Sequence, residues 1–97
     1  MFARIGTFQI KPDKLDEAIK FYQDSIIPDV RAQKGSHSSF LLVDRATANA
    51  VSVAFWDSKE DMMATEESGA VKEWVSRFNK YFAKPITTER FEVCAQG

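Results

Sequence analysis

The chain has 97 residues, 44% of them hydrophobic and 28% charged, a composition typical of one folded domain and unlike that of disordered chains. Thirteen basic residues nearly balance fourteen acidic ones, and no two basic residues are adjacent. The sequence therefore lacks the basic patch of a protein that binds nucleic acid or an anionic membrane, and we expect neither partner. Its uninterrupted apolar runs reach only four residues, far below the roughly 20 that a membrane span needs.

The sequence favours a single cytoplasmic domain over residues 1–97. The N-terminal residues lack the basic start and apolar block of a signal peptide. Cys94 is the only cysteine, so no disulfide can form within the chain, which fits a reducing compartment. No Gly-rich phosphate loop, paired-cysteine metal motif or Ser/His/Asp signature is present, so we expect no cofactor and no metal.

A β-hairpin is the clearest element. Residues 40–44 and 50–56 are rich in branched and aromatic side chains, and the short segment 45–49 separates them. Both alternating sets of side chains in the second run are largely apolar, so both faces of the sheet should be covered. Ser58 and Asp61 then form a capping signal for a following helix.

The segment before the hairpin predicts a strand and a helix. Residues 2–10 should form the strand, in which Gly6 marks a place where another group approaches the backbone closely. Asp13 is expected to cap the helix, which carries one apolar stripe at helical spacing. Pro28 should kink or end this helix near Ile27, and one further turn is the alternative.

The segment after the hairpin predicts a broken helix and a last strand. The helix that begins after Ser58 is expected to break near Gly69. Pro85 should close the second helical part, and residues 88–95 should form the strand. Five apolar residues give that second part a strong stripe: Val71, Trp74, Val75, Phe78 and Phe82.

The resulting order is strand, helix, strand, strand, helix, strand. It predicts an α+β fold of the ferredoxin-like βαββαβ type, with a four-stranded antiparallel sheet and both helices on one face. The other face also carries apolar residues, and monomers rarely leave such a face in water. We therefore expect a homodimer joined through the sheet faces.

Residues 53–61 (Val-Ala-Phe-Trp-Asp-Ser-Lys-Glu-Asp), with the hairpin and the order of elements, resemble the antibiotic-biosynthesis monooxygenase-like family of dimeric α+β barrels. The resemblance covers nearly the whole chain. It implies ferredoxin-like subunits paired through their sheets, with small-molecule pockets between helices and sheet. Some members oxidise aromatic polyketides or quinols with oxygen and without metal or flavin, others degrade haem, and many have no assigned activity.

The resemblance does not extend to the haem-degrading branch. That branch uses an asparagine on the first strand, a tryptophan inside the second helix and a haem-ligating histidine further along it. Here the first strand has Gly6, Thr7 and Gln9 but no asparagine, and no histidine lies in the second helical segment. Trp74 is helical but lies beyond the matching part. Haem degradation is therefore disfavoured.

His37 is the candidate catalytic base, because it alone has an ordinary pKa near neutrality. It is expected in a serine-rich loop just before the second strand. As a base it could deprotonate a phenol or quinol and make the ring electron-rich enough to react with oxygen. The alternative is a solvated loop histidine.

Three further residues are candidates for a small-molecule site. Trp56 could form the wall of an aromatic pocket, or belong to the core or an interface. Tyr22 could direct its hydroxyl into the pocket, or be a core tyrosine. Arg4 could bind an anionic oxygen in the catalytic step, or form a salt bridge with a carboxylate such as Glu92 or Asp44.

Two functions therefore remain. One is a cofactor-independent monooxygenase that acts on a small aromatic or quinol-like compound. The other is a non-catalytic dimer that binds a small apolar ligand or serves as an interaction module. Polar groups that converge in one cavity would favour catalysis, and a purely apolar lining would favour binding.

Overall fold

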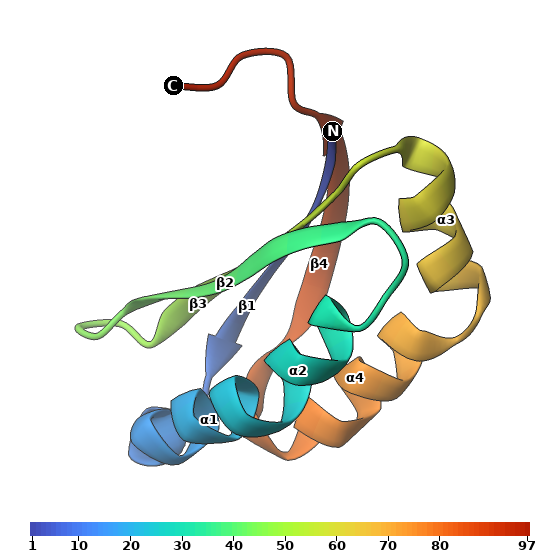
Figure 1. Ribbon diagram of the computed structural model, residues 1–97. Helices are drawn as coiled ribbons and strands as arrows, with labels where there is room; N and C mark the ends of the chain where they lie inside the picture. Colours follow the sequence, from blue (N-terminus) through green and yellow to red (C-terminus); the bar gives the residue numbers. More distant parts are fainter.

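A computed structural model describes residues 1–97 as an α+β fold in which helices cover one face of a four-stranded sheet (Figure 1). The strands lie in the order β2-β3-β1-β4, and all neighbours are antiparallel. The fold class and the sheet expected from the sequence are confirmed. In chain order the elements are β1 (Phe2–Ile10), α1 (Leu15–Phe21), α2 (Ile27–Arg31), β2 (Ser36–Asp44), β3 (Asn49–Trp56), α3 (Lys59–Glu67), α4 (Ala70–Phe78) and β4 (Phe82–Glu92).

A π-helical turn, Tyr22–Ile26, joins α1 to α2, so the helix continues past Pro28. Proline has no N–H to donate to the preceding turn. The N–H of Ile27 instead reaches back to the carbonyl of Tyr22, which widens the helix by one residue. The alternative of a further turn beyond Ile27 is thus the correct one. Asp13 does not cap the helix: it lies inside a short 3₁₀ turn and its side chain makes no capping bond.

The hairpin is longer than its apolar runs predict. β2 begins at Ser36, so His37 lies in a strand and not in the loop before it. The pairing with β3 shifts by one residue between Ser36 and Ser39, which marks a β-bulge. The serine-rich segment lacks the apolar pattern of a regular strand, and the bulge allows it to be part of β2.

The helix after the hairpin begins and breaks where the sequence predicts. The Ser58 hydroxyl accepts a hydrogen bond from the Asp61 N–H at 3.1 Å and caps α3. Gly69 separates α3 from α4 with φ of 88°, a left-handed conformation that favours glycine.

The last strand begins earlier than expected. α4 ends at Phe78, a 3₁₀ turn follows, and Phe82 opens β4 instead of continuing the helix. Pro85 therefore lies inside β4 and does not end a helix. It is tolerated because β4 is an edge strand and its register against β1 is irregular at this point.

An aromatic cluster fills the space between sheet and helices. The ring of Phe78 on α4 lies 5.8 Å from Phe8 on β1, 5.5 Å from Phe82 and 5.1 Å from Tyr81, measured between centroids. Most of these pairs meet at steep angles, which favours the edge-to-face attraction of aromatic rings. The stripe on α4 thus docks the helix on the sheet.

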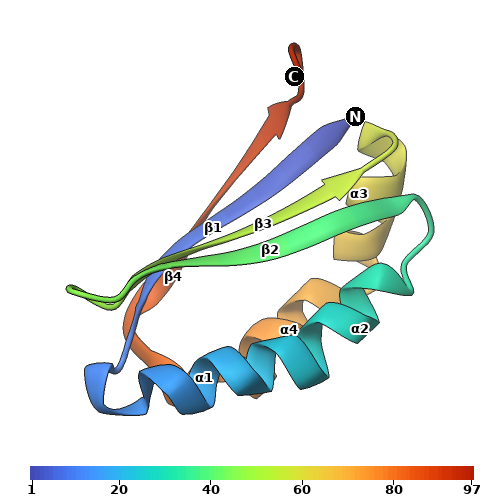
Figure 2. The ribbon, with the colours of Figure 1, turned by 60° about the vertical axis from the view of Figure 1, so that its left-hand side comes forward.

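All helices lie on one side of the sheet, and the opposite face is bare (Figure 2). On that face three large apolar side chains are about half exposed: Phe40 (50%), Leu42 (53%) and Phe91 (49%). Phe40 packs edge-on against Phe55 at 6.4 Å between centroids. The bare face therefore carries exposed apolar side chains on both edge strands, β2 and β4. None of the helices combines the length and the apolar character that a membrane crossing requires.

Candidate functional site

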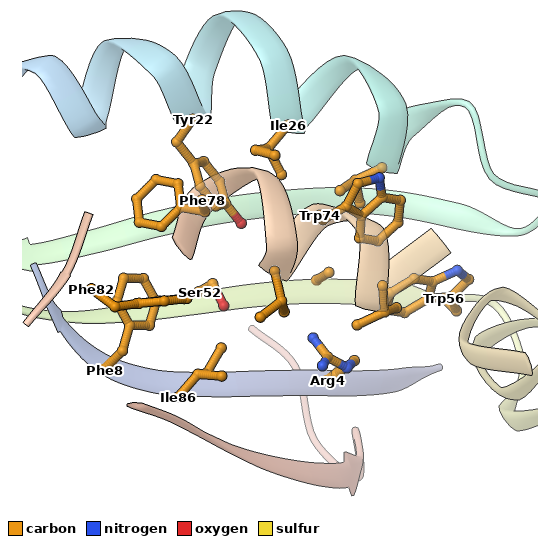
Figure 3. Close-up of a pocket in the computed structure, with 14 residues that line it drawn as sticks. Arg4, Phe8, Tyr22, Ile26, Ser52, Trp56, Trp74, Phe78, Phe82 and Ile86 are labelled. Atoms are coloured by element: carbon orange, nitrogen blue, oxygen red, sulfur yellow. The ribbon is translucent and has the colours of Figure 1, made fainter. Parts of the chain in front are cut away.

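A cavity of about 50 Å³ lies between the helices and the covered face of the sheet (Figure 3). Fourteen residues line it and twelve of them are hydrophobic. The few polar groups would therefore fix the orientation of a bound ligand. Arg4, Tyr22 and Ser52 supply them. The principal apolar walls are Phe8, Trp56, Trp74, Phe78, Phe82 and Ile86.

Gly6 keeps the sheet side of this cavity open. A Cβ at this position would lie 2.6 Å from Cδ1 of Ile86 and 2.8 Å from Oγ of Ser52. These distances are shorter than any ordinary carbon contact, so a side chain here would push both groups out of place. The sequence expectation of a close approach at Gly6 is confirmed.

Arg4 projects from β1 at the end of the cavity away from Phe8 (Figure 3). Its Nε donates to Oε1 of Glu66 on α3 at 3.3 Å, and its Nη2 donates to Oγ1 of Thr88 at 3.4 Å. Burial lowers the pKa of Arg4, and the Glu66 carboxylate opposes this effect. The expected salt bridge exists, but its partner is neither Glu92 nor Asp44.

Glu66 also binds Arg90, which lies outside the cavity. Arg90 Nε donates to both carboxylate oxygens of Glu66, at 2.9 and 3.0 Å. The hydrogen bond from Arg90 is the main cause that lowers the pKa of Glu66 below its ordinary value. The Glu66 carboxylate thus accepts hydrogen bonds from two guanidinium groups, those of Arg4 and Arg90.

Tyr22 reaches the cavity from the π-helical turn, and its hydroxyl points toward the sheet near Ser52 (Figure 3). Burial raises the pKa of Tyr22, although a side-chain hydrogen bond with Ser52 and the charge of Arg4 act in the opposite direction. Tyr22 is therefore neutral at physiological pH, and its hydroxyl can donate or accept a hydrogen bond.

Trp56 forms one wall of the cavity and is completely buried, with 0% of its surface exposed. Its indole Nε1 is buried without a hydrogen-bond partner. Buried polar groups are nearly always paired, so this N–H is available to an acceptor. Trp74, on α4, lines the same end of the cavity (Figure 3).

His37 does not line this cavity. Its side chain is 52% exposed, and its Nε2 contacts Oδ1 of Asp57, which follows β3. Of the four residues that the sequence nominates, the structure brings Arg4, Tyr22 and Trp56 to one cavity and leaves His37 apart.

Sequence reasoning missed Ser52 and Glu66 as parts of the site. Ser52 had a detectable signal, since it is the one hydroxyl among the inward-facing residues of β3 (Ala50, Ser52, Ala54 and Trp56). Glu66 had none, because it stands in an acidic stretch that predicts a helix end, and its partners are distant in sequence. No group of three or more His, Cys, Asp and Glu side chains is close enough to hold a metal ion.

Residues 1–77 match the family described as Antibiotic biosynthesis monooxygenase. The uncharacterized protein Rv2557 of Mycobacterium tuberculosis is 35% identical over 65 residues, which is 66% of this chain and 29% of that protein. The chain thus spans less than a third of the length of this curated relative.

Two solved structures from Streptomyces share the fold. The cofactor-independent oxygenase SnoaB of Streptomyces nogalater has a TM-score of 0.74 at 11% identity, over 98% of this chain and 94% of that one. A monooxygenase from the gene ActVA-Orf6 of Streptomyces coelicolor, in complex with the ligand Nanaomycin D, has a TM-score of 0.72 at 16% identity, over 98% and 88%. At such identities the likeness concerns the fold.

Proposed function

Because the chain belongs to the antibiotic biosynthesis monooxygenase family, we propose that it is a cofactor-independent monooxygenase acting on a small aromatic or quinol-like compound in the cavity under the helices. The observation that carries this proposal is one charged group and two hydroxyls directed into an otherwise apolar space. SnoaB, a cofactor-independent oxygenase of the same fold, and the monooxygenase seen with Nanaomycin D support it.

The proposed reaction balances without an added reductant. A phenol and one O₂ give a quinone and one water, so one oxygen atom enters the ring and the other leaves as water. The aromatic compound itself supplies all four electrons that O₂ takes up. Only an electron-rich ring can do so, and its phenolate form is the more electron-rich one.

Arg4 is the group we assign to stabilise the phenolate. A guanidinium stays protonated in proteins and provides directed N–H donors for an anionic oxygen. In an apolar cavity its charge is screened less than in water, so it lowers the pKa of a bound phenol and raises the phenolate fraction. Tyr22 and Trp56 orient the ring, by a hydrogen bond and as a wall respectively.

His37 is the alternative source of proton abstraction. Its side chain contacts Asp57 and is half exposed, so it is open to solvent. It would have to act on a substrate that extends out of the cavity, since His37 is not part of the lining. Stabilisation of the phenolate by Arg4 and proton abstraction by His37 predict different effects of substitutions at these two residues.

The cavity also limits the size of the ligand. Its volume of about 50 Å³ is below the roughly 150 Å³ of an apolar cavity that admits benzene. A ring therefore enters only if a wall moves outward or if part of the ring stays outside. Monocyclic compounds fit this site better than fused polycyclic ones.

The second candidate function is a non-catalytic dimer that binds a small ligand or acts as an interaction module. One observation favours it: no side chain in the cavity is a base at neutral pH, since Arg4 is protonated and Tyr22 is neutral. Binding without reaction needs only shape and apolar contact.

We further propose that two copies pair through their bare sheet faces. The half-exposed side chains of Phe40, Leu42 and Phe91 support this, because burial of such groups stabilises by about 25 cal/mol for each Å² removed from water. The cavity lies on the opposite side of the sheet, so pairing leaves it accessible.

The direct test is oxygen uptake. Purified protein, treated with a chelator, is mixed with single phenols and quinols in an oxygen electrode, and uptake is compared with protein-free buffer. The proposal predicts oxygen uptake with at least one monocyclic compound. Adding metal, flavin or haem should not increase this uptake. Uptake that appears only after one of these is added would overturn it.

A further inference from the structure

Two arginines share one carboxylate at the Arg4 end of the cavity. The Glu66 side chain is only 13% exposed, and both guanidinium groups approach its Oε1. The charged and titratable groups that act on Arg4 are Glu66, Arg90 and the tyrosine of the cavity, Tyr22. Since Tyr22 is neutral, one positive charge in this cluster has no counter-ion.

Arg90 is the better partner of Glu66. Its Nε donates to Oε2 at 3.0 Å and its Nη2 donates to Oε1 at 2.5 Å, whereas Arg4 makes one contact at 3.3 Å. Two-point contacts between guanidinium and carboxylate are the stronger and more directional ones. The negative charge of Glu66 therefore neutralises mainly Arg90, and the positive charge without a counter-ion is that of Arg4.

Arg4 directs this charge at the cavity, and its side chain is 14% exposed. Its remaining contact, to the neutral hydroxyl of Thr88, is long at 3.4 Å. A charge held in an apolar environment without a full counter-ion is unfavourable. An anionic oxygen placed against Arg4 would remove this penalty.

We propose that the cavity selects an aromatic ligand in its anionic form, with the negative oxygen against Arg4. Arg90, outside the cavity, increases the affinity for this anion because it binds Glu66 and so weakens the pairing of Glu66 with Arg4. Arg90 and Glu66 are thus positioning residues. This inference rests on the proposed function in one respect, that the cavity is the ligand site. It requires no turnover.

The test compares benzoate with benzamide, which have the same ring and nearly the same size but differ in charge. The probes are the two indole N–H signals in a ¹⁵N NMR spectrum. The chain has only two tryptophans, and both line the cavity. The wild-type chain should bind benzoate roughly tenfold more tightly than benzamide, because hydrogen bonds to charged groups contribute more than neutral ones.

Substitutions at the two positioning residues should move benzoate affinity in opposite directions. In Arg90→Gln the released Glu66 pairs fully with Arg4, so benzoate should bind several-fold more weakly. In Glu66→Gln the counter-charge is gone, so benzoate should bind more tightly. Benzamide affinity should stay unchanged in both. Arg45→Gln is the matched control, since Arg45 is an exposed arginine paired with Asp16.

Equal affinity for the two ligands, an Arg90→Gln variant that behaves like Arg45→Gln, or no indole shift with either ligand would each overturn the inference. Should Glu66→Gln fail to fold, Arg90→Gln carries the test alone, because the Arg90 side chain is 48% exposed. Oxygen uptake without benzoate selectivity would refute this inference only. Benzoate selectivity without oxygen uptake would refute the proposed monooxygenase only.

Discussion

Nε of Arg4 lies 3.3 Å from Oε1 of Glu66, although 62 residues separate them in the chain. This contact joins β1 to α3 and fixes the charge at one end of the cavity. It also makes stability depend on pH. The pKa of Glu66 is lowered in the folded protein, mainly by the hydrogen bond from Arg90, so the folded state favours the ionised carboxylate.

The first prediction concerns Glu66→Gln. A carboxyl with a lowered folded pKa stabilises the fold above its unfolded value of about 4.3, and this contribution is lost as pH falls through the folded pKa. Glu66→Gln should therefore lower the free energy of unfolding by about 1–3 kcal/mol at pH 7, with the deficit shrinking below about pH 4. Urea titrations at several pH values measure it.

Glu67→Gln on the same helix is the control, because Glu67 is exposed. It should change stability by less than about 0.5 kcal/mol at any pH. A Glu66→Gln deficit that stays constant down to pH 2 would contradict the assigned ion pair.

The second prediction concerns the space above Gly6. Gly6→Ala should displace Ile86 and Ser52 into the cavity, since its Cβ would lie 2.6 and 2.8 Å from them. Affinity for a one-ring ligand such as benzoate should fall by about tenfold or more, equivalent to about 1.4 kcal/mol. Calorimetric titration measures the loss.

The double variant Gly6→Ala, Ile86→Ala should recover part of the affinity, because it removes the Ile86 atoms that the new methyl group meets and leaves only the contact with Oγ of Ser52. If the single variant binds as the wild type does, the ligand does not occupy the cavity on this side.

The third prediction concerns the bare sheet face. Leu42→Glu places a charge among apolar side chains that the proposed dimer buries, so it should convert the assembly from twice the 11.0 kDa chain mass to a single chain. Sedimentation velocity measures the mass. Gln23→Glu, on the exposed side of the π-helical turn, should leave the dimer intact. A wild-type chain that sediments as a monomer at micromolar concentration would refute the sheet-to-sheet dimer.

How much of this architecture follows from sequence is clear from particular residues. Ser58 and Asp61 predict the start of α3 correctly, because a cap depends only on residues three apart. The α4 stripe predicts the buried Trp74 and Phe78 for the same local reason. Pro85 misleads, since its tolerance in β4 depends on the strand being at the edge, which only the assembled sheet determines.

The site is less predictable than the fold. Arg4, Tyr22 and Trp56 could be nominated by residue type and by the side of the element that they occupy. The position of His37 depends on a bulge, and the link from Glu66 to Arg4 and Arg90 depends on how α3 packs against the sheet. Neither has a local signature.

The fourth prediction separates Tyr22 from His37. If the cavity binds the reacting ring, Tyr22→Phe should raise KM several-fold while leaving the fold intact, since it removes one hydroxyl and keeps the aromatic ring. His37→Ala should leave turnover within about twofold of wild type. A loss of roughly 10²–10⁴-fold in His37→Ala would instead identify His37 as the base.

The central claim is that the chain inserts oxygen into an aromatic ring held against Arg4. The measurement is turnover of a monocyclic phenol under ¹⁸O₂, with the product analysed by mass spectrometry, for wild type and Arg4→Met. Glu66 keeps its contacts with Arg90 in this variant, so its fold should persist. The account predicts one labelled oxygen atom per product molecule for wild type and a rate lower by roughly 10²–10³-fold for Arg4→Met. Unlabelled product, or an Arg4→Met variant as fast as the wild type, would contradict it.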